Sequence, residues 1–346
     1  MPRDPPVTIA TFPERELSRV MSTDYLRMAV KRGALQEGRP TVTSASLHPA
    51  PLHPALLQSR YSMSLAVVLG AGDLGGTLAH ELARRDRFCE VRLVDAAERV
   101  AAGKALDICQ AGPVEGFRTR VVGTGDDRAV AGGSVVLLAD AAGPRPGEWQ
   151  GEAGLDRLCR ALRVNPRVPI VCAGPAAAWL VERGVAELGI PRAAIVGSAP
   201  AALAAAVTAI VALEARVSPQ HVELLLAGRP PDRLVIAWEE ASIAGGRPSS
   251  VLKANVLARI RARVPHLWPP GPYALAAAAA CVAEALQHGT RQQLICFAAL
   301  DDETGGRGRV SAVPVRFKVG AVAEISLPAL STAEYIAFQN ALTSTR

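Results

Sequence analysis

The chain has 346 residues, of which 49% are hydrophobic, so it is long enough to form two domains with buried cores. Its formal net charge of +6 comes mainly from singly spaced arginines, and only 4% of residues are aromatic, which argues against a nucleic-acid surface. No apolar stretch is long and clean enough to span a membrane, and six scattered cysteines without a C-x-x-C pair argue against a metal site or disulfide framework and favour a reducing cytoplasm.

Residues 1–62 differ in composition from the rest of the chain. They are rich in Pro, Ser and Thr and show no sustained hydrophobic period. Acidic residues such as Asp4 and Glu14 argue against a mitochondrial presequence, and no apolar core marks a secretory signal. The segment is predicted to be a disordered extension, or the product of a start codon placed too far upstream, with a compact domain beginning near Met63.

Residues 65–95 contain the strongest functional signal. The apolar run 65–69 predicts a buried strand, and the glycine-rich run 70–75 leads into a helix expected from 76 to about 85. A second strand, expected over 91–94, ends at Asp95, twenty residues beyond Gly75. A G-x-G-x-x-G run between a strand and a helix, followed at this distance by an acid, is typical of dinucleotide-binding domains.

Each part of this run has a physical role in that reading. Gly70 permits the tight turn, Gly72 lets backbone N–H groups approach a pyrophosphate at the helix N-terminus, and Gly75 lets helix and strand pack closely. A carboxylate at Asp95 would accept the ribose hydroxyls and repel a 2′-phosphate, which favours NAD over NADP. The predicted cofactor-binding residues are Gly70, Ala71, Gly72, Asp73, Leu74, Gly75 and Asp95. The alternative is that the glycines serve packing alone.

The remaining elements follow in chain order. Helices are expected over 98–110, 155–163 and 176–188, strands over 120–122, 134–139, 168–173 and 194–197, and a Gly/Pro-rich loop over 140–154. Alternating strands and helices imply parallel βαβ units, so residues 63–200 are predicted to form one dinucleotide-binding domain. Residues 201–346 are predicted to form a second, α+β domain. Its expected helices, the first starting just before the boundary, are 199–215, 249–264, 273–287 and one from 332; its expected strands are 222–227, 233–238, 294–299, 310–316 and 321–326.

Several short stretches add to the glycine run: Leu93–Asp95, Gly103–Asp107, Gly112–Phe117, Gly123–Asp126, Val217–Ser218 and Val313–Val315. Together they resemble the malate/lactate dehydrogenase family over about residues 65–345, closest to the lactate-dehydrogenase-like malate dehydrogenases. The resemblance implies a Rossmann doubly wound parallel sheet, followed by the α+β C-terminal domain of that family. It also implies NAD as cofactor, hydride transfer between NAD and a 2-hydroxy acid, and homo-oligomers or a hetero-oligomer with a relative.

The resemblance also marks departures from the family's chemistry. That chemistry uses a His for the hydroxyl proton, an Asp that orients it, arginines that hold and polarise the substrate, and an Asn after the fifth strand. When the chain is aligned to the family without gaps, other residues stand at all of these positions. The His falls on Pro230, the Asp and the Arg that clamps the substrate carboxylate fall on Leu203 and Ala206, and the Asn falls on Gly174. The two loop arginines fall on Pro144 and Gln150, and a serine expected near the nicotinamide falls in Pro269–Gly271. No catalytic residue and no metal ligand is therefore assigned. Asp140 falls on a small-residue position close to where the pyrophosphate should lie.

Three functional hypotheses stay open at this point. The favoured one is a protein that binds NAD but has lost or strongly altered 2-hydroxy-acid dehydrogenase activity, and acts as a sensor, a scaffold or the partner of an active relative. The alternative is an active NAD-dependent oxidoreductase, malate-dehydrogenase-like with a CH–OH donor, that takes a changed small carbonyl or hydroxy compound. Arg145, Arg229 and Asp232 are candidates for a relocated site, whereas Glu148 and Glu152 would repel a dicarboxylate. The third hypothesis is a decaying gene without a selected role.

Overall fold

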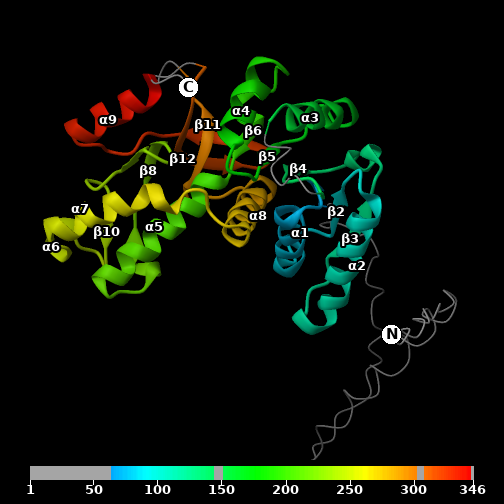
Figure 1. Cartoon of the computed structure of the whole chain (residues 1–346), viewed down its shortest axis with the longest axis horizontal. Coiled ribbons are helices and arrows are strands. Elements are labelled where there is room, and N and C mark those ends of the chain that lie inside the picture. Colours follow the sequence, from blue (N-terminus) through cyan, green and yellow to red (C-terminus); the bar gives the residue numbers. More distant parts are fainter. Residues whose placement is uncertain (1–63, 144–150, 302–307, 344–346) are drawn as a thin grey trace, which may run out of the picture. The chain divides into compact units, whose positions relative to one another are not determined.

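A computed structural model describes residues 64–143, 151–301 and 308–343 (Figure 1). These residues belong to one compact unit that begins near Arg60. The extension predicted for residues 1–62 lies outside the described residues.

The first half of this unit is the predicted doubly wound sheet. Its parallel strands pair in the order β3-β2-β1-β4-β5-β6. The elements are β1 (Leu65–Leu69), α1 (Asp73–Arg85), β2 (Glu90–Val94), α2 (Glu98–Glu115), β3 (Arg120–Thr124), β4 (Val135–Leu138), α3 (Glu152–Val164), β5 (Ile170–Cys172), α4 (Ala177–Ala186) and β6 (Ile195–Gly197). This order confirms the Rossmann-type fold predicted from the alternation of strands and helices.

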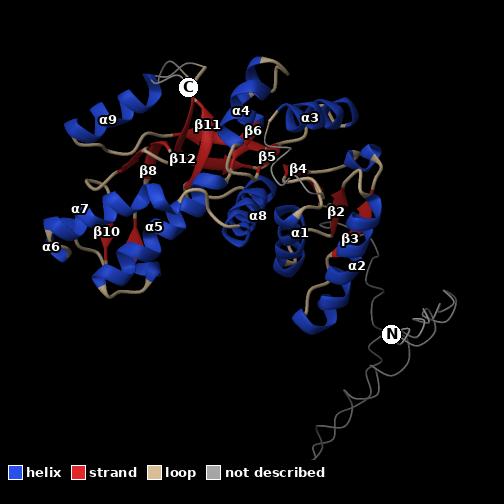
Figure 2. Ribbon diagram, viewed as in Figure 1, coloured by secondary structure: helices blue, strands red, loops and turns tan. Residues whose placement is uncertain are grey.

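The strands of this sheet are covered on both faces. All five residues of β1 and all four of β4 are buried, as expected for parallel strands between two layers of helices. Helices α1 and α2 pack against each other on one face, and α3 and α4 pack together on the other (Figure 2). Because β1 lies between β2 and β4, the carboxyl ends of these three strands meet at one edge.

The second half extends the same sheet with antiparallel strands. Strand β11 pairs with β6 through Phe297 and Gly197, and the sheet continues through β12 and β8 to β9, with β13 also on β12. The remaining elements are α5 (Ala199–Ala215), β7 (Val222–Glu223), β8 (Leu226–Arg229), β9 (Arg233–Ile236), β10 (Ser242–Ile243), α6 (Pro248–Val251), α7 (Ala254–Arg263), α8 (Pro272–His288), β11 (Leu294–Ala299), β12 (Val310–Lys318), β13 (Ala321–Ile325) and α9 (Thr332–Thr343). Helix α8 packs on both α1 and α5, so it joins the two halves (Figure 2). The domain boundary placed near residue 200 stays a prediction.

Several element boundaries differ by a few residues from the sequence-based expectation, and three of the differences are larger. Helix α2 runs past the expected end at residue 110 and contains Pro113, because a proline in the last turn removes only one N–H donor and Gly116 closes the turn with φ +84°. The strand expected over 222–227 is split, and its first part pairs with β10 in a separate ribbon. The helix expected over 249–264 is broken at Leu252, whose backbone is extended. The Leu252 side chain is only 6% exposed, because the extended backbone lets it pack into the core.

Within the described ranges, no helix is both long and apolar enough to cross a membrane. The same residues contain no group of three or more His, Cys, Asp or Glu side chains that could hold a metal ion.

Candidate functional site

The turn between β1 and α1 lies at the edge where the carboxyl ends of β2, β1 and β4 meet. Gly70 has φ +108°, which a residue with a side chain rarely adopts, and its N–H donates to Val94 O at 2.8 Å. The N–H of Gly72 donates to Asp140 O at 2.9 Å. The turn is therefore held by backbone groups at the end of β2 and just after β4.

Asp95, the predicted ribose acceptor, is turned into the protein and is 2% exposed. Its Oδ2 accepts the N–H groups of Ala71 at 2.8 Å and Ala142 at 2.9 Å, and its Oδ1 accepts the N–H of Ala97 at 2.8 Å. A carboxylate offers about four lone-pair positions, so these bonds leave one. Asp95 therefore ties three segments together, and its contact with a ribose stays a prediction.

Asp140 is the second residue after the end of β4 and lies against the N-terminus of α1. Its Oδ1 accepts the N–H of Gly75 at 2.8 Å and its Oδ2 accepts the N–H of Leu74 at 3.2 Å. Gly72 occupies the N-cap position and has no side chain with which to cap the helix. Asp140 therefore supplies the cap from 65 residues away, and its negative charge meets the positive end of the helix dipole.

The glycines of the turn are packed against backbone and against this carboxylate. A Cβ on Gly72 would lie 2.4 Å from both Cγ and Oδ2 of Asp140, and a Cβ on Gly75 would lie 1.9 Å from the carbonyl oxygen of Gly70. Lys104 on α2 donates from Nζ to the carbonyl oxygen of Gly72 at 2.7 Å. Close packing of turn, helix and strand, one of the roles predicted for the glycines, is thus seen directly.

This geometry bears on how a dinucleotide would fit. A pyrophosphate at the start of a Rossmann helix needs free backbone N–H groups there. Here the N–H groups of Leu74 and Gly75 already donate to Asp140, and the same carboxylate fills the space beside Gly72. A pyrophosphate therefore fits this turn only after the Asp140 side chain has moved.

The positions that the resemblance assigns to the His, its orienting Asp, the clamp Arg and the Asn are aliphatic or lack a side chain. Leu203 on α5 is fully buried in the core, and Ala206 is half-buried one turn further along. Gly174 follows β5 and is buried, and Pro230 lies in the turn between β8 and β9. None of these side chains can transfer a proton or bind a carboxylate.

The charged residues next to Pro230 are placed differently from each other. Arg229 lies 3.6 Å from Glu182 of α4, as an ion pair between its Nη2 and Oε2 of the glutamate. Asp232 is exposed. Four of the loop positions named above, Pro144, Arg145, Glu148 and Gln150, lie outside the described residues. Glu152 is the exposed first residue of α3.

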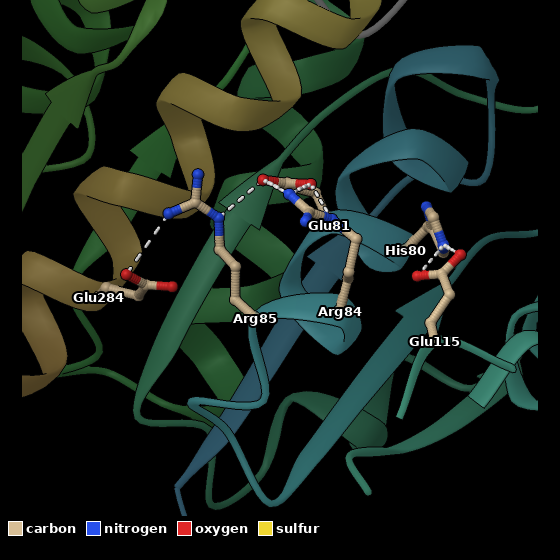
Figure 3. A network of polar contacts seen from close by, with 6 residues as sticks. All are labelled: His80, Glu81, Arg84, Arg85, Glu115 and Glu284. Atoms are coloured by element: carbon tan, nitrogen blue, oxygen red, sulfur yellow. Dashed lines mark hydrogen bonds and ion pairs between the residues drawn. The ribbon is translucent and has the colours of Figure 1, made fainter. Parts of the chain in front are cut away.

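The ionic network on α1 is separate from the glycine turn. Figure 3 shows Glu81 between Arg84 and Arg85, Arg85 paired with Glu284 of α8, and His80 paired with Glu115 of α2. The Arg85–Glu284 distance is 3.5 Å and the His80–Glu115 distance is 3.0 Å. Burial by itself would raise the pKa of Glu81, but hydrogen bonds from Arg85 and Arg84 outweigh it and hold that pKa below its ordinary value. The contact between His80 and Glu115 therefore joins α1 to α2.

One buried charge had no signal in the sequence. Arg157 on α3 is 4% exposed and forms an ion pair with Asp127, the first residue of a short 3₁₀ helix (Asp127–Val130). Its burial lowers the pKa of this guanidinium, and the charge of Asp127 opposes that effect. An arginine in an amphipathic helix is ordinarily expected on the exposed face, so only the packing of α3 reveals this pair.

The fold and the turn define a Rossmann-type dinucleotide-binding protein with an α+β second half. Comparison with known proteins agrees: residues 65–152 match the family model of the lactate/malate dehydrogenase NAD-binding domain. Malate dehydrogenase of Dehalococcoides mccartyi (strain CBDB1) is 30% identical over 275 residues, which is 75% of this chain and 89% of that protein. Malate dehydrogenase of Roseiflexus sp. (strain RS-1) is 28% identical over 274 residues, which is 75% of this chain and 88% of that protein.

Solved structures show the same fold. Malate dehydrogenase from Salinibacter ruber superposes with a TM-score of 0.72 at 26% identity, covering 80% of this chain and 93% of that one. Lactate dehydrogenase from Cryptosporidium parvum, solved with lactic acid and nicotinamide adenine dinucleotide, has a TM-score of 0.75 at 22% identity and covers 81% and 94% of the two chains. The chain belongs to the malate/lactate dehydrogenase family, and NAD is the cofactor of its first domain.

Proposed function

We propose that this chain is an NAD-binding member of the malate/lactate dehydrogenase family whose ordinary 2-hydroxy-acid dehydrogenase activity is lost or strongly altered. In this proposal it works as a sensor, a scaffold or the partner of an active relative, in the cytoplasm and as a homo- or hetero-oligomer. The observation that carries the proposal is the apolar stretch of α5, where Leu203, at the position of the orienting Asp, is fully buried.

The expected loss of rate is large. A positioned acid/base contributes about 10²–10⁴-fold, and a charge-stabilising group of the oxyanion-hole kind about 10²–10³-fold. Such losses do not simply multiply once a constellation is incomplete. Because the acid/base and the carboxylate-binding groups are replaced together, we expect turnover of malate or lactate near background.

A second candidate function keeps dehydrogenase activity, and the relatives, which are named malate dehydrogenases, support that part of it. In this version the chain is an active NAD-dependent oxidoreductase with an uncharged carbonyl or hydroxy compound as substrate. A site at the turn between β8 and β9 would use Arg229 and Asp232. The Arg229–Glu182 pair argues against Arg229 facing a substrate in this conformation.

The test is NADH oxidation by the full chain with oxaloacetate, with pyruvate and with a panel of uncharged aldehydes and ketones. The proposal expects rates close to those without enzyme for both acids. Ordinary turnover of either acid would overturn it. Turnover of an uncharged carbonyl that is lost in Arg229→Ala and in Asp232→Ala, but kept when the exposed Arg291 is changed to Ala, would favour the second function.

A further inference from the structure

The N-terminus of α1 is the place where a dinucleotide and this chain's own carboxylate would meet. The Asp140 carboxylate accepts hydrogen bonds there from the backbone N–H groups of Leu74 and Gly75. Backbone N–H groups at a helix N-terminus are also the groups that bind a pyrophosphate in this fold. Two negatively charged acceptors cannot use the same donors at once.

The Asp140 side chain is held in this place by more than one contact. Asp140 is 8% exposed. Its backbone carbonyl accepts the N–H of Gly72, so both the backbone and the side chain of Asp140 are bonded to the turn and the start of α1. The neighbouring Ala142 N–H donates to Asp95, which is itself bonded to Ala71. The turn is therefore closed by two buried carboxylates that together accept five backbone N–H groups.

From this arrangement we infer that Asp140 is an intramolecular competitor of the dinucleotide pyrophosphate and sets the affinity of the NAD site. This inference rests on the proposed NAD binding. A ligand that binds only the form with Asp140 displaced has its apparent affinity reduced by the fraction of molecules in that form. A small side chain at this position removes the competitor and leaves the N–H groups of Leu74 and Gly75 free.

The experiment is NADH titration of the full chain, followed by calorimetry or by nicotinamide fluorescence, for the natural protein, Asp140→Ala and Asp140→Asn. Asp140→Ala is expected to lower the Kd for NADH by about tenfold or more. Asp140→Asn, which removes the charge but keeps most of the bulk, is expected to give a smaller decrease. The matched control is Asp107→Asn on α2, an exposed carboxylate whose removal is expected to change the Kd by less than about twofold.

A second readout separates competition from a merely structural role. Without NADH, Asp140→Ala is expected to unfold at lower urea than the natural protein, because α1 loses its cap. Tighter NADH binding together with lower stability supports the inference, whereas weaker binding together with lower stability overturns it. If Asp140→Ala does not fold, Asp140→Asn decides by the same comparison.

The failure of this inference and that of the proposed function give different results. Equal NADH affinities in the natural protein and both Asp140 variants overturn the inference and leave NAD binding in place. No binding at millimolar NADH in any of the three overturns both, because removal of the carboxylate then opens no site.

Discussion

Replacing Asp95 by Ala is expected to destabilise the whole dinucleotide-binding half, and not only to weaken a ribose contact. Asp95 is 2% exposed and accepts N–H groups from the glycine turn, from the start of α2 and from the segment after β4. Removing its carboxylate leaves all three donors without a partner. The turn after β1 and the segment after β4 then lose their shared anchor.

The size of the effect follows from these bonds. A hydrogen bond to a charged group contributes about 1.5–3 kcal/mol. The donor at Ala71 is buried, whereas those at Ala97 and Ala142 are half-buried and can partly be satisfied by water. We therefore expect Asp95→Ala to lower the free energy of unfolding by about 3–6 kcal/mol, which is the loss of the buried bond in full and of the two half-buried bonds at about half their value each.

The assay is urea unfolding of the full chain at neutral pH, with Asp107→Ala as the matched control. Asp107 is exposed on α2, so its removal is expected to change the stability by less than about 0.5 kcal/mol. A loss below about 1 kcal/mol in Asp95→Ala would refute the reasoning, because it would mean that the carboxylate is not tied to these donors in solution. If the large loss is found, weak NADH binding by this variant cannot be assigned to the ribose contact alone.

Two further perturbations test the packing and the electrostatics of α1. In Gly75→Ala the new Cβ would lie 1.9 Å from Gly70 O, so the free energy of unfolding should fall by about 2 kcal/mol or more. In the control Gly103→Ala, on the exposed face of α2, the Cβ meets nothing within 4 Å, so the free energy of unfolding should rise by up to about 1 kcal/mol. Urea unfolding measures both, and equal stabilities of the two variants would contradict this reasoning. Asp86 ends α1 with φ +52°, and hydrogen bonds from the Arg118 N–H and then from Thr119 hold its pKa below the ordinary 3.8. The stability that this lowered pKa supplies is complete well above pH 3.8 and is lost as the pH falls through the lower folded value. The advantage over Asp86→Asn should therefore stay constant from pH 6 to about pH 5 and shrink as the pH falls below about 4. Asn is the replacement because it tolerates the left-handed backbone of this position. A stability difference between the two proteins that does not change with pH would contradict this reasoning.

Much of the fold could be predicted because its signals are local. The apolar runs of β1 and β4, the glycines after β1 and the Ala-rich helix over 199–215 each show their structure within a few residues. The predicted boundaries of helices and strands were wrong where packing opposed the local pattern, as at Leu252, whose burial breaks the predicted helix. The position of Arg157 was also out of reach, because its partner Asp127 belongs to another element.

The sequence by itself determined that strands and helices alternate, that a glycine-rich turn follows the first strand and that acids follow the second and fourth strands. It also indicated that Asp140 lies near a pyrophosphate position. Only the tertiary structure decided what these acids bind. Strand β1 lies between β2 and β4, so the ends of strands far apart in the chain meet at one turn, where Asp95 and Asp140 accept N–H groups from residues up to 66 positions away. Hydrogen-bond partners at that distance depend on strand order, which no local pattern encodes.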